Sequence, residues 1–176
     1  MEFTHSSRPE VIEWRRGEFV ISTDPARLDL SVIHGFLTTS YWAKGIPRET
    51  VARAIEHSLC FGVYDERGKF PLLAKAARSG APQVSGIPQV GFARVISDFA
   101  TYAYIADVFI LESHRGQGLG KALMESIVQH PALQGLRRWN LSTVDAHKLY
   151  AQVGFAAPKW PERYMEILRP NIYETV

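Results

Sequence analysis

A glycine-rich turn between a strand and a helix constrains this chain more than any other feature. Residues 114–124 read HRGQGLGKALM, with glycine at 116, 118 and 120. An apolar strand-like run precedes the turn, and apolar residues recur at helical spacing after it. Glycines let backbone N–H groups converge, and the following helix adds the positive end of its dipole. With Arg115 before the glycines and Lys121 after them, the turn suits a diphosphate.

The glycine spacing argues against two common phosphate-binding folds. The P-loop pattern GxxxxGK[ST] is absent, since Ala122 follows Lys121. The dinucleotide pattern GxGxxG is also absent, because the spacing is GxGxG and no βαβ unit surrounds it. The partner motifs of a kinase glycine loop are missing as well. ATP and NAD are therefore disfavoured as ligands.

Length and composition predict one globular domain over residues 1–176. The chain has 46% hydrophobic residues and a net charge of +2, without a basic run that would favour nucleic acid. The single cysteine, Cys60, excludes an internal disulfide and a CxxC metal site, and its apolar setting predicts a core position. No signal-peptide core and no membrane-length apolar stretch is present, so we expect a soluble, cytoplasmic protein.

The hydrophobic pattern predicts an α/β mixture with the element order βααβββαβαββ. We expect the first helix to begin at Asp24-Pro25 and fade near Tyr41–Gly45, and the second to begin after Pro47. The irregular stretch 67–88 is expected to be a long hairpin connection. Strands that follow each other directly in the sequence favour antiparallel pairing. The remaining expected elements are strands at 18–24, 60–66, 89–98, 102–111, 137–143, from Phe155 and at 163–170, with helices after Gly118 and before Gly154.

The turn also resembles a known family motif. RGQGLG is similar to motif A, [QR]xxGx[GA], of the GNAT superfamily of N-acetyltransferases, with Arg115, Gly118 and Gly120 at the defined positions. Upstream, IADVFILESH resembles the family's fourth strand, and downstream AHKLYAQVGF resembles its A-x-x-L-Y-x-x-x-G-F segment. The resemblance spans roughly residues 18–170. It implies a GNAT fold: a central mixed, mostly antiparallel twisted sheet of about six to seven strands, flanked by about four helices.

The resemblance implies acetyl-CoA as co-substrate, with no metal. Its pantetheine would lie along the strand at Val108, Phe109 and Ile110. Thr143 stands where many relatives have asparagine, which leaves that pantetheine contact open, and Ala146 follows it. The pyrophosphate would lie on the backbone N–H groups of Arg115, Gly116, Gln117, Gly118, Leu119, Gly120 and Lys121.

Two residues are candidates for proton transfer. The tyrosine that matches Tyr150 often faces the CoA sulfur in this family, where it would donate a hydrogen bond or a proton to the leaving thiolate. Asp107 interrupts an apolar strand, and its alternation places it on the face of Ile105 and Phe109. It is a candidate base, or else a buried carboxylate paired with an arginine or with backbone groups. Glu112 and His147 are weaker alternatives for the base, with solvated positions as their simpler interpretation.

The acceptor end is less determined. Tyr41 and Trp42 offer aromatic walls that favour a cationic acceptor, whereas Lys44 and Arg48 favour an anionic acceptor. We expect an acyltransferase that moves an acetyl group to a primary amine of a small molecule, by direct attack in a ternary complex. Acetylation of a protein lysine or N-terminal amine, or a non-catalytic CoA-binding regulatory domain, stays open. A homodimer is compatible with the resemblance, but no residue specifies one.

Overall fold

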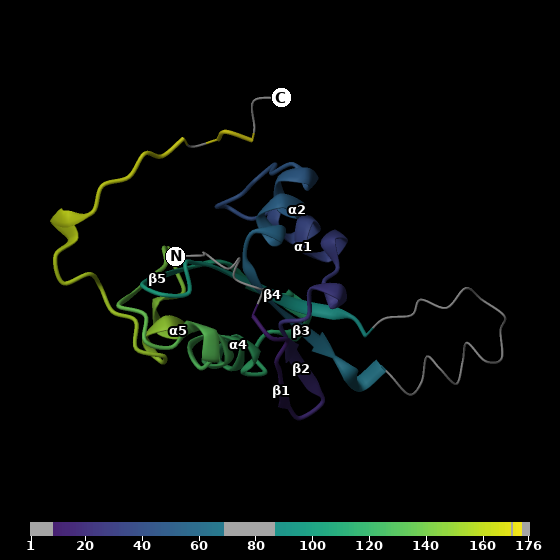
Figure 1. Ribbon diagram of the computed structural model, residues 1–176. Coiled ribbons are helices and arrows are strands. Elements are labelled where there is room, and N and C mark those ends of the chain that lie inside the picture. The colour runs from purple at the N-terminus through teal and green to yellow at the C-terminus, as the bar shows by residue number, and fades with distance from the viewer. Residues whose placement is uncertain (1–8, 69–86, 170, 174–176) are drawn as a thin grey trace, which may run out of the picture.

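The computed structural model describes residues 9–68, 87–169 and 171–173. In this part of the chain six strands form one sheet in the order β1-β2-β3-β4-β5-β6 (Figure 1). Neighbours from β1 to β5 run antiparallel, and β6 runs parallel to β5. The strands are β1 (Glu13–Arg16), β2 (Phe19–Ser22), β3 (Leu59–Asp65), β4 (Gln89–Ser97), β5 (Tyr102–Ile110) and β6 (Arg138–Asn140).

Helices cover both faces of the sheet in the described residues. One face packs against α4 (Leu119–Val128) and α5 (His147–Ala151), and the other against α1 (Leu30–Leu37) and α2 (Arg48–Glu56) (Figure 1). Each face has its own core, as the two-residue alternation of strands requires. A mixed, mostly antiparallel sheet of six strands with four helices confirms the predicted fold class.

The strand predicted at 18–24 is confirmed as β2, but the strand before it, β1, was missed. The structure has a hairpin there, in which Gly17 at a φ of 58° joins β1 to β2. The sequence EWRR hides β1, because it lies at the sheet edge and buries little besides Trp14, whose ring stacks 6.0 Å from that of Phe61. A strand at the sheet edge that buries one side chain shows no alternation of apolar and polar residues in its sequence.

The start and end of the first helix were also predicted wrongly. Asp24 and Pro25 open only a short 3₁₀ turn, Pro25–Arg27, and α1 starts three residues later. Asp29 is its N-cap, since its carboxylate accepts hydrogen bonds from the N–H groups of Ser31 and Val32 at 2.8 and 3.2 Å. The helix ends at Leu37, which leaves Tyr41 and Trp42 in a loop. The second helix begins after Pro47 as predicted.

A β-bulge in β5 changes the orientation of Asp107. Phe92 pairs with Phe109, and Arg94 pairs with Ala106, so two residues of β5 oppose one residue of β4. Asp107 adopts a φ of 55°, in the left-handed region. Because the extra residue shifts the alternation, Ile105 and Phe109 lie in different cores, and the prediction that Asp107 shares a face with both was wrong.

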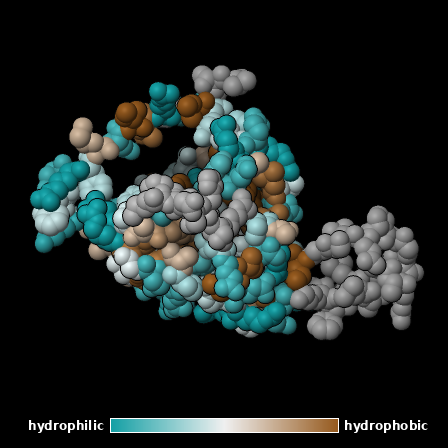
Figure 2. All heavy atoms as spheres, in the orientation of Figure 1, coloured by the Kyte–Doolittle hydropathy of each residue, from teal (hydrophilic) through white to brown (hydrophobic). Residues whose placement is uncertain are grey.

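The C-terminal part departs most from prediction. β6 has three residues instead of seven, and no strand occurs at 155–169. The segment extends away from the body and returns towards α2 (Figure 1). Met165, Ile167 and Leu168 are exposed at 99%, 93% and 69%. Figure 2 shows hydrophobic and hydrophilic residues next to each other along this extended segment. Alternating residues indicate a strand only where a partner completes the ladder, and none does so here.

The connection between β3 and β4 lies largely outside the described residues, which omit 69–86. Its two ends do join antiparallel neighbours, since Tyr64 pairs with Gln89.

Cys60 is buried, as predicted. Among the described helices, none has the length and apolar character that crossing a membrane requires.

The buried imidazole of His130 makes the stability of the fold depend on pH. Its ring is 1% exposed, lies against Trp14 and Phe61, and accepts a hydrogen bond from Ala132 N–H at 3.2 Å. Burial lowers the pKa of this imidazole from its usual 6.5. The unfolded chain therefore binds a proton that the folded chain resists, so stability is present above about pH 6.5 and declines as the pH falls below it.

We predict that His130→Asn reduces this pH dependence. Asparagine retains an acceptor for Ala132 N–H but does not titrate, while loss of the ring costs about 1–3 kcal/mol at pH 8. Urea unfolding between about pH 8 and pH 5 checks this, because the wild-type free energy of unfolding should fall more steeply than that of the variant. Parallel curves for the two proteins would show that His130 does not carry the effect.

Candidate functional site

β5 has one fully paired edge and one open edge. It pairs with β4 along nearly its whole length, but with β6 only through Tyr102–Tyr104. In the described residues no strand faces Ile105–Ile110 on the β6 side. An open strand edge can bind amide groups as a further strand would.

The three residues predicted to line this edge differ in their surroundings. Val108 lines the main cavity and also packs against the core below α4. Phe109 is buried, with its ring stacked 3.9 Å from that of Phe36 on the other face. The carbonyl of Ile110 accepts a hydrogen bond from Arg115 Nε at 3.1 Å. Phe109 can therefore present only its backbone to a ligand.

The glycine turn begins α4 without a side-chain cap. Gly116 and Gly118 have φ values of 77° and 75°, which other residues rarely adopt, and Gly118 is the N-cap residue. The hydrogen bond from Ala122 N–H to Gly118 O is the first of the helix. His114 and Arg115 N–H already donate to Leu111 O and Glu112 O, so the N–H groups of 116–121 are the ones left to another acceptor. Leu119 is buried and anchors the helix, while Gly120 lies beside Leu149. The arrangement suits an anion at the helix start.

Three cations surround this turn. Arg115 is exposed but held by Ile110 O, and Lys121 lies 3.6 Å from Glu125. The third is Arg16 of β1, which sequence analysis missed. A Cβ placed on Gly118 would lie 3.1 Å from Arg16 Nη2. The β1–β2 hairpin brings Arg16 to the turn across about a hundred residues of sequence, so no local pattern could have revealed it.

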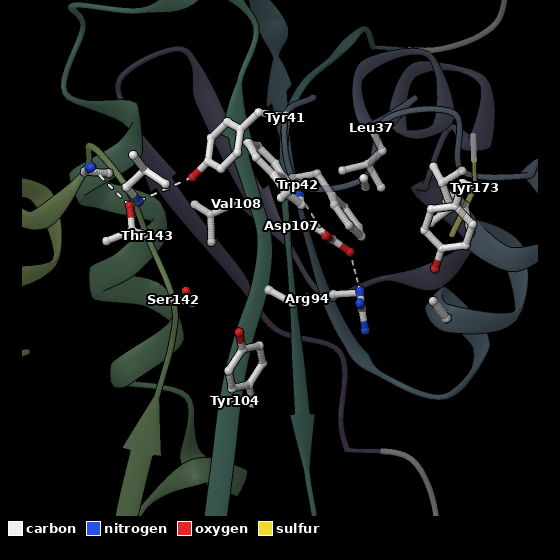
Figure 3. Close-up of a pocket in the computed structure, with 18 of the residues that line it drawn as sticks. Leu37, Tyr41, Trp42, Arg94, Tyr104, Asp107, Val108, Ser142, Thr143 and Tyr173 are labelled. Carbon is white, nitrogen blue, oxygen red and sulfur yellow. Dashed lines mark hydrogen bonds and ion pairs between the residues drawn. The ribbon is translucent and has the colours of Figure 1, made fainter. Parts of the chain in front are cut away.

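The main cavity lies between the open edge of β5 and the α1–α2 loop, with a volume of about 450 Å³ (Figure 3). It brings together seven of the predicted site residues with several that were not predicted. The predicted residues are Tyr41, Trp42, Asp107, Val108, Thr143, Ala146 and Tyr150, and the additional ones include Arg94, Tyr104, Asp145, Glu166 and Tyr173.

Asp107 is held by two donors in this cavity. Its Oδ1 accepts a hydrogen bond from Trp42 Nε1 at 3.1 Å, and its Oδ2 forms an ion pair with Arg94 Nε (Figure 3). Both charged side chains are mostly buried, at 19% and 11% exposure. Arg94 Nη1 also donates to Ser58 Oγ at 3.4 Å. The bulge thus directs Asp107 towards the acceptor side of the sheet, where Arg94 neutralises it.

Tyr150 also lines this cavity. It is 8% exposed, and burial, followed by the nearby phenol of Tyr41 and carboxylate of Asp145, raises the pKa of Tyr150 to about 12. Its hydroxyl lacks a hydrogen-bonding partner within the described residues. Thr143 Oγ1 accepts a hydrogen bond from Ala146 N–H at 3.1 Å, which orients the start of α5, the helix that carries Tyr150.

Tyr41 and Trp42 close the cavity from above. Their rings meet edge to face at 4.9 Å, and Tyr41 Oη accepts a hydrogen bond from Val144 N–H at 3.4 Å (Figure 3). This bond ties the α1–α2 loop to the segment after β6. Both rings remain partly exposed, so they form a wall rather than a core.

Other candidates lie outside this cavity. Glu112 begins a short exposed 3₁₀ turn, His147 is exposed on α5, and neither lines the cavity. Lys44 and Arg48 do not line it either, and Arg48 Nη2 donates to Ser31 Oγ at 3.3 Å. Arg94 had a usable signal, because a single arginine inside the apolar strand QVGFARVIS needs a partner. In the described chain, no group of three His, Cys, Asp or Glu side chains could hold a metal ion.

Comparison with known proteins is consistent with this geometry. The family profile described as Acetyltransferase (GNAT) domain matches residues 85–157. A candidate acetyltransferase of Gibberella zeae is 33% identical over 144 residues, which cover 79% of each of the two chains.

Two solved structures extend the comparison. A candidate GNAT-family acetyltransferase from Xanthomonas campestris pv. campestris is 47% identical, with a TM-score of 0.75 over 89% of this chain and 97% of that one. A candidate acetyltransferase from Clostridium acetobutylicum, solved with acetyl-CoA, is 13% identical, with a TM-score of 0.54 over 85% and 94% of the two chains. At that identity the second likeness concerns the fold alone.

The profile match covers the strand, the glycine turn and the tyrosine helix that build the site. Relatives above 30% identity extend the likeness over most of the chain. The chain therefore belongs to the GNAT acetyltransferase family, and it is an acyltransferase.

Proposed function

We propose that this protein transfers an acetyl group from acetyl-CoA to the primary amine of a small molecule in a ternary complex. The observation that carries the proposal is a single cavity that joins the donor side to the acceptor side. Val108, Thr143 and Tyr150 line it together with Trp42 and Asp107. A volume of about 450 Å³ is within the range of small-molecule sites.

The residues present fit acetyl-CoA. The glycine turn and the first N–H groups of α4 would hold its pyrophosphate, since they offer uncapped donors and a positive helix end. The open edge of β5 near Val108 would take the pantetheine amides, with Thr143 across from it. When bound, acetyl-CoA supplies the acetyl thioester.

Tyr150 would stabilise the departing thiolate as a hydrogen-bond donor. Its pKa of about 12 keeps the phenol protonated throughout the working pH range. A thiol has a pKa of about 8.5, so complete proton transfer from Tyr150 to the thiolate is uphill by roughly 5 kcal/mol. Tyr150 therefore acts mainly by donating a hydrogen bond, and the proton reaches the sulfur from water.

Asp107 remains our candidate for receiving the proton of the acceptor amine, directly or through water. Each of its oxygens accepts one hydrogen bond, from Trp42 or Arg94, and a carboxylate oxygen has a second acceptor site. An acceptor N–H can therefore still bind to it. The same two bonds orient the carboxylate towards the cavity.

The charges around the cavity favour an acceptor that carries a second positive group. Arg94 and Asp107 neutralise each other, whereas Asp145 and Glu166 add exposed carboxylates to the lining. Lys44 and Arg48, which would favour an anion, do not line the cavity. Aromatic faces beside these carboxylates add cation–π attraction. We propose a short alkyl diamine as the type of acceptor.

Gly118→Ala tests the proposed phosphate site. A Cβ there requires the left-handed backbone at a φ of 75° and meets Arg16 at 3.1 Å, so CoA affinity should fall about tenfold or more. Gly135→Ala is the matched control, since it has the same φ with open space around it and lies away from the turn. Isothermal titration with CoA measures both variants. If both variants lose the same CoA affinity, the loss comes from general destabilisation of the fold and not from the turn.

Tyr150→Phe tests the donor role. We expect kcat to fall about a hundredfold, since removing the phenol O–H leaves the thiolate without its donor. The dissociation constant for acetyl-CoA should change less than about threefold, since the ring still packs against Phe155. Steady-state rates and titration together separate the two. Unchanged turnover would eliminate this role.

An acceptor series tests the substrate class. 1,4-Diaminobutane, butylamine and 4-aminobutanoate share one chain length and differ in the charge at the far end. We expect kcat/KM to decrease in that order, by about threefold to tenfold at each step in low salt. Glu166→Gln should lower kcat/KM for 1,4-diaminobutane and so reduce its preference over butylamine. The value of kcat/KM for butylamine should change little.

Thiol release measured with each amine decides between the outcomes. A preference for 4-aminobutanoate would contradict the cationic acceptor and assign the recognition to Arg94. No amine-dependent release with any small acceptor would contradict the small-molecule function itself.

A further inference from the structure

Arg16 lies against the first residues of α4, although it belongs to the opposite end of the chain. A Cβ on Gly118 would be 3.1, 3.7 and 3.8 Å from the Nη2, Cζ and Nε atoms of Arg16. The guanidinium therefore lies alongside the turn, and glycine at 118 leaves room for it. In Figure 1 the start of α4 lies beside the β1–β2 hairpin that carries this arginine.

The position is unfavourable for a cation without an anion nearby. The N-terminus of a helix carries a partial positive charge, which repels a guanidinium. The side chain of Arg16 forms no hydrogen bond or ion pair within the described residues, while its backbone pairs with that of Phe19. Its neighbour Arg15, by contrast, donates to Glu66 at 2.8 Å.

The other cations of the turn are already engaged. Arg115 donates Nε to Ile110 O, and Lys121 lies near Glu125. Arg16 is thus the cation of this group whose side chain has no partner within the described residues, and it lies beside Gly118, the uncapped N-cap residue of α4. A guanidinium and a helix start that would otherwise repel each other can share one phosphate.

We propose that Arg16 binds a phosphate group of CoA and so contributes an affinity determinant from the β1–β2 hairpin. The proposal rests on the use of acetyl-CoA put forward above. Both the pyrophosphate and the 3′-phosphate of CoA offer the same chemistry, a phosphate oxygen pair for a guanidinium. Arg16 supplies charge-assisted hydrogen bonds in addition to the backbone donors of the turn.

Titration of CoA into the full chain tests the proposal without relying on turnover. Arg16→Gln should weaken CoA binding about tenfold or more and make the affinity less dependent on salt, since one charge–phosphate contact is lost. Arg15→Gln, which removes the same charge next door, should stay within about twofold. Arg16→Lys should recover part of the affinity, because it restores the charge without the planar fork.

Binding of 3′-dephospho-CoA then locates the contact. If the loss caused by Arg16→Gln disappears with this ligand, Arg16 binds the 3′-phosphate, and if the loss persists, it binds the pyrophosphate. Either result supports the proposal. Thermal melting confirms that each variant is folded before titration.

Affinity of Arg16→Gln within twofold of wild type would overturn the proposal, as would an equal loss in Arg15→Gln. Absence of CoA binding by the wild-type chain would instead contradict the proposed function. The two failures are therefore distinguishable.

Discussion

β5 has two hydrogen-bonding edges, and the sheet satisfies only one of them along its length. Pairing with β6 stops at Tyr104, and the next residues of β5 have no strand beside them in the described chain. Unpaired backbone donors and acceptors are costly unless water or a ligand binds them. The bulge at Asp107 lies in the same stretch and directs a carboxylate to the opposite face. Opening and bulge together leave this strand with an unpaired edge and with a carboxylate that lines the cavity.

Charge is divided between two regions of this arrangement. The glycine turn lies at the end of β5, where the α4 dipole and Arg16 favour phosphates. The cavity further along the strand holds a neutralised ion pair, aromatic rings and two exposed carboxylates. An anionic carrier and a cationic acceptor would therefore be attracted to different places. Tyr150, kept protonated by burial, lines this cavity.

Local patterns predicted the features that depend on neighbours in sequence. Local sequence predicted the glycine turn, the helix after Pro47 and the buried strands, because each has its own hydrophobic periodicity or a glycine or proline at its boundary. The partners of Asp107 were not, since Trp42 and Arg94 come from a distant loop and a neighbouring strand. A bulge reverses alternation without changing composition, so the face of Phe109 could not be predicted. The segment after Phe155 alternates like a strand, yet pairing is a property of two segments rather than one.

Hydrogen–deuterium exchange with and without CoA tests the central claim most directly, namely that the open edge of β5 and the glycine turn receive the cofactor. The account predicts slower exchange of the amides in 105–110 and 115–121 when CoA is bound, because both segments gain hydrogen-bond acceptors. The amides of β4, already paired with β5, should change little. Bound CoA without protection in these two segments would contradict it.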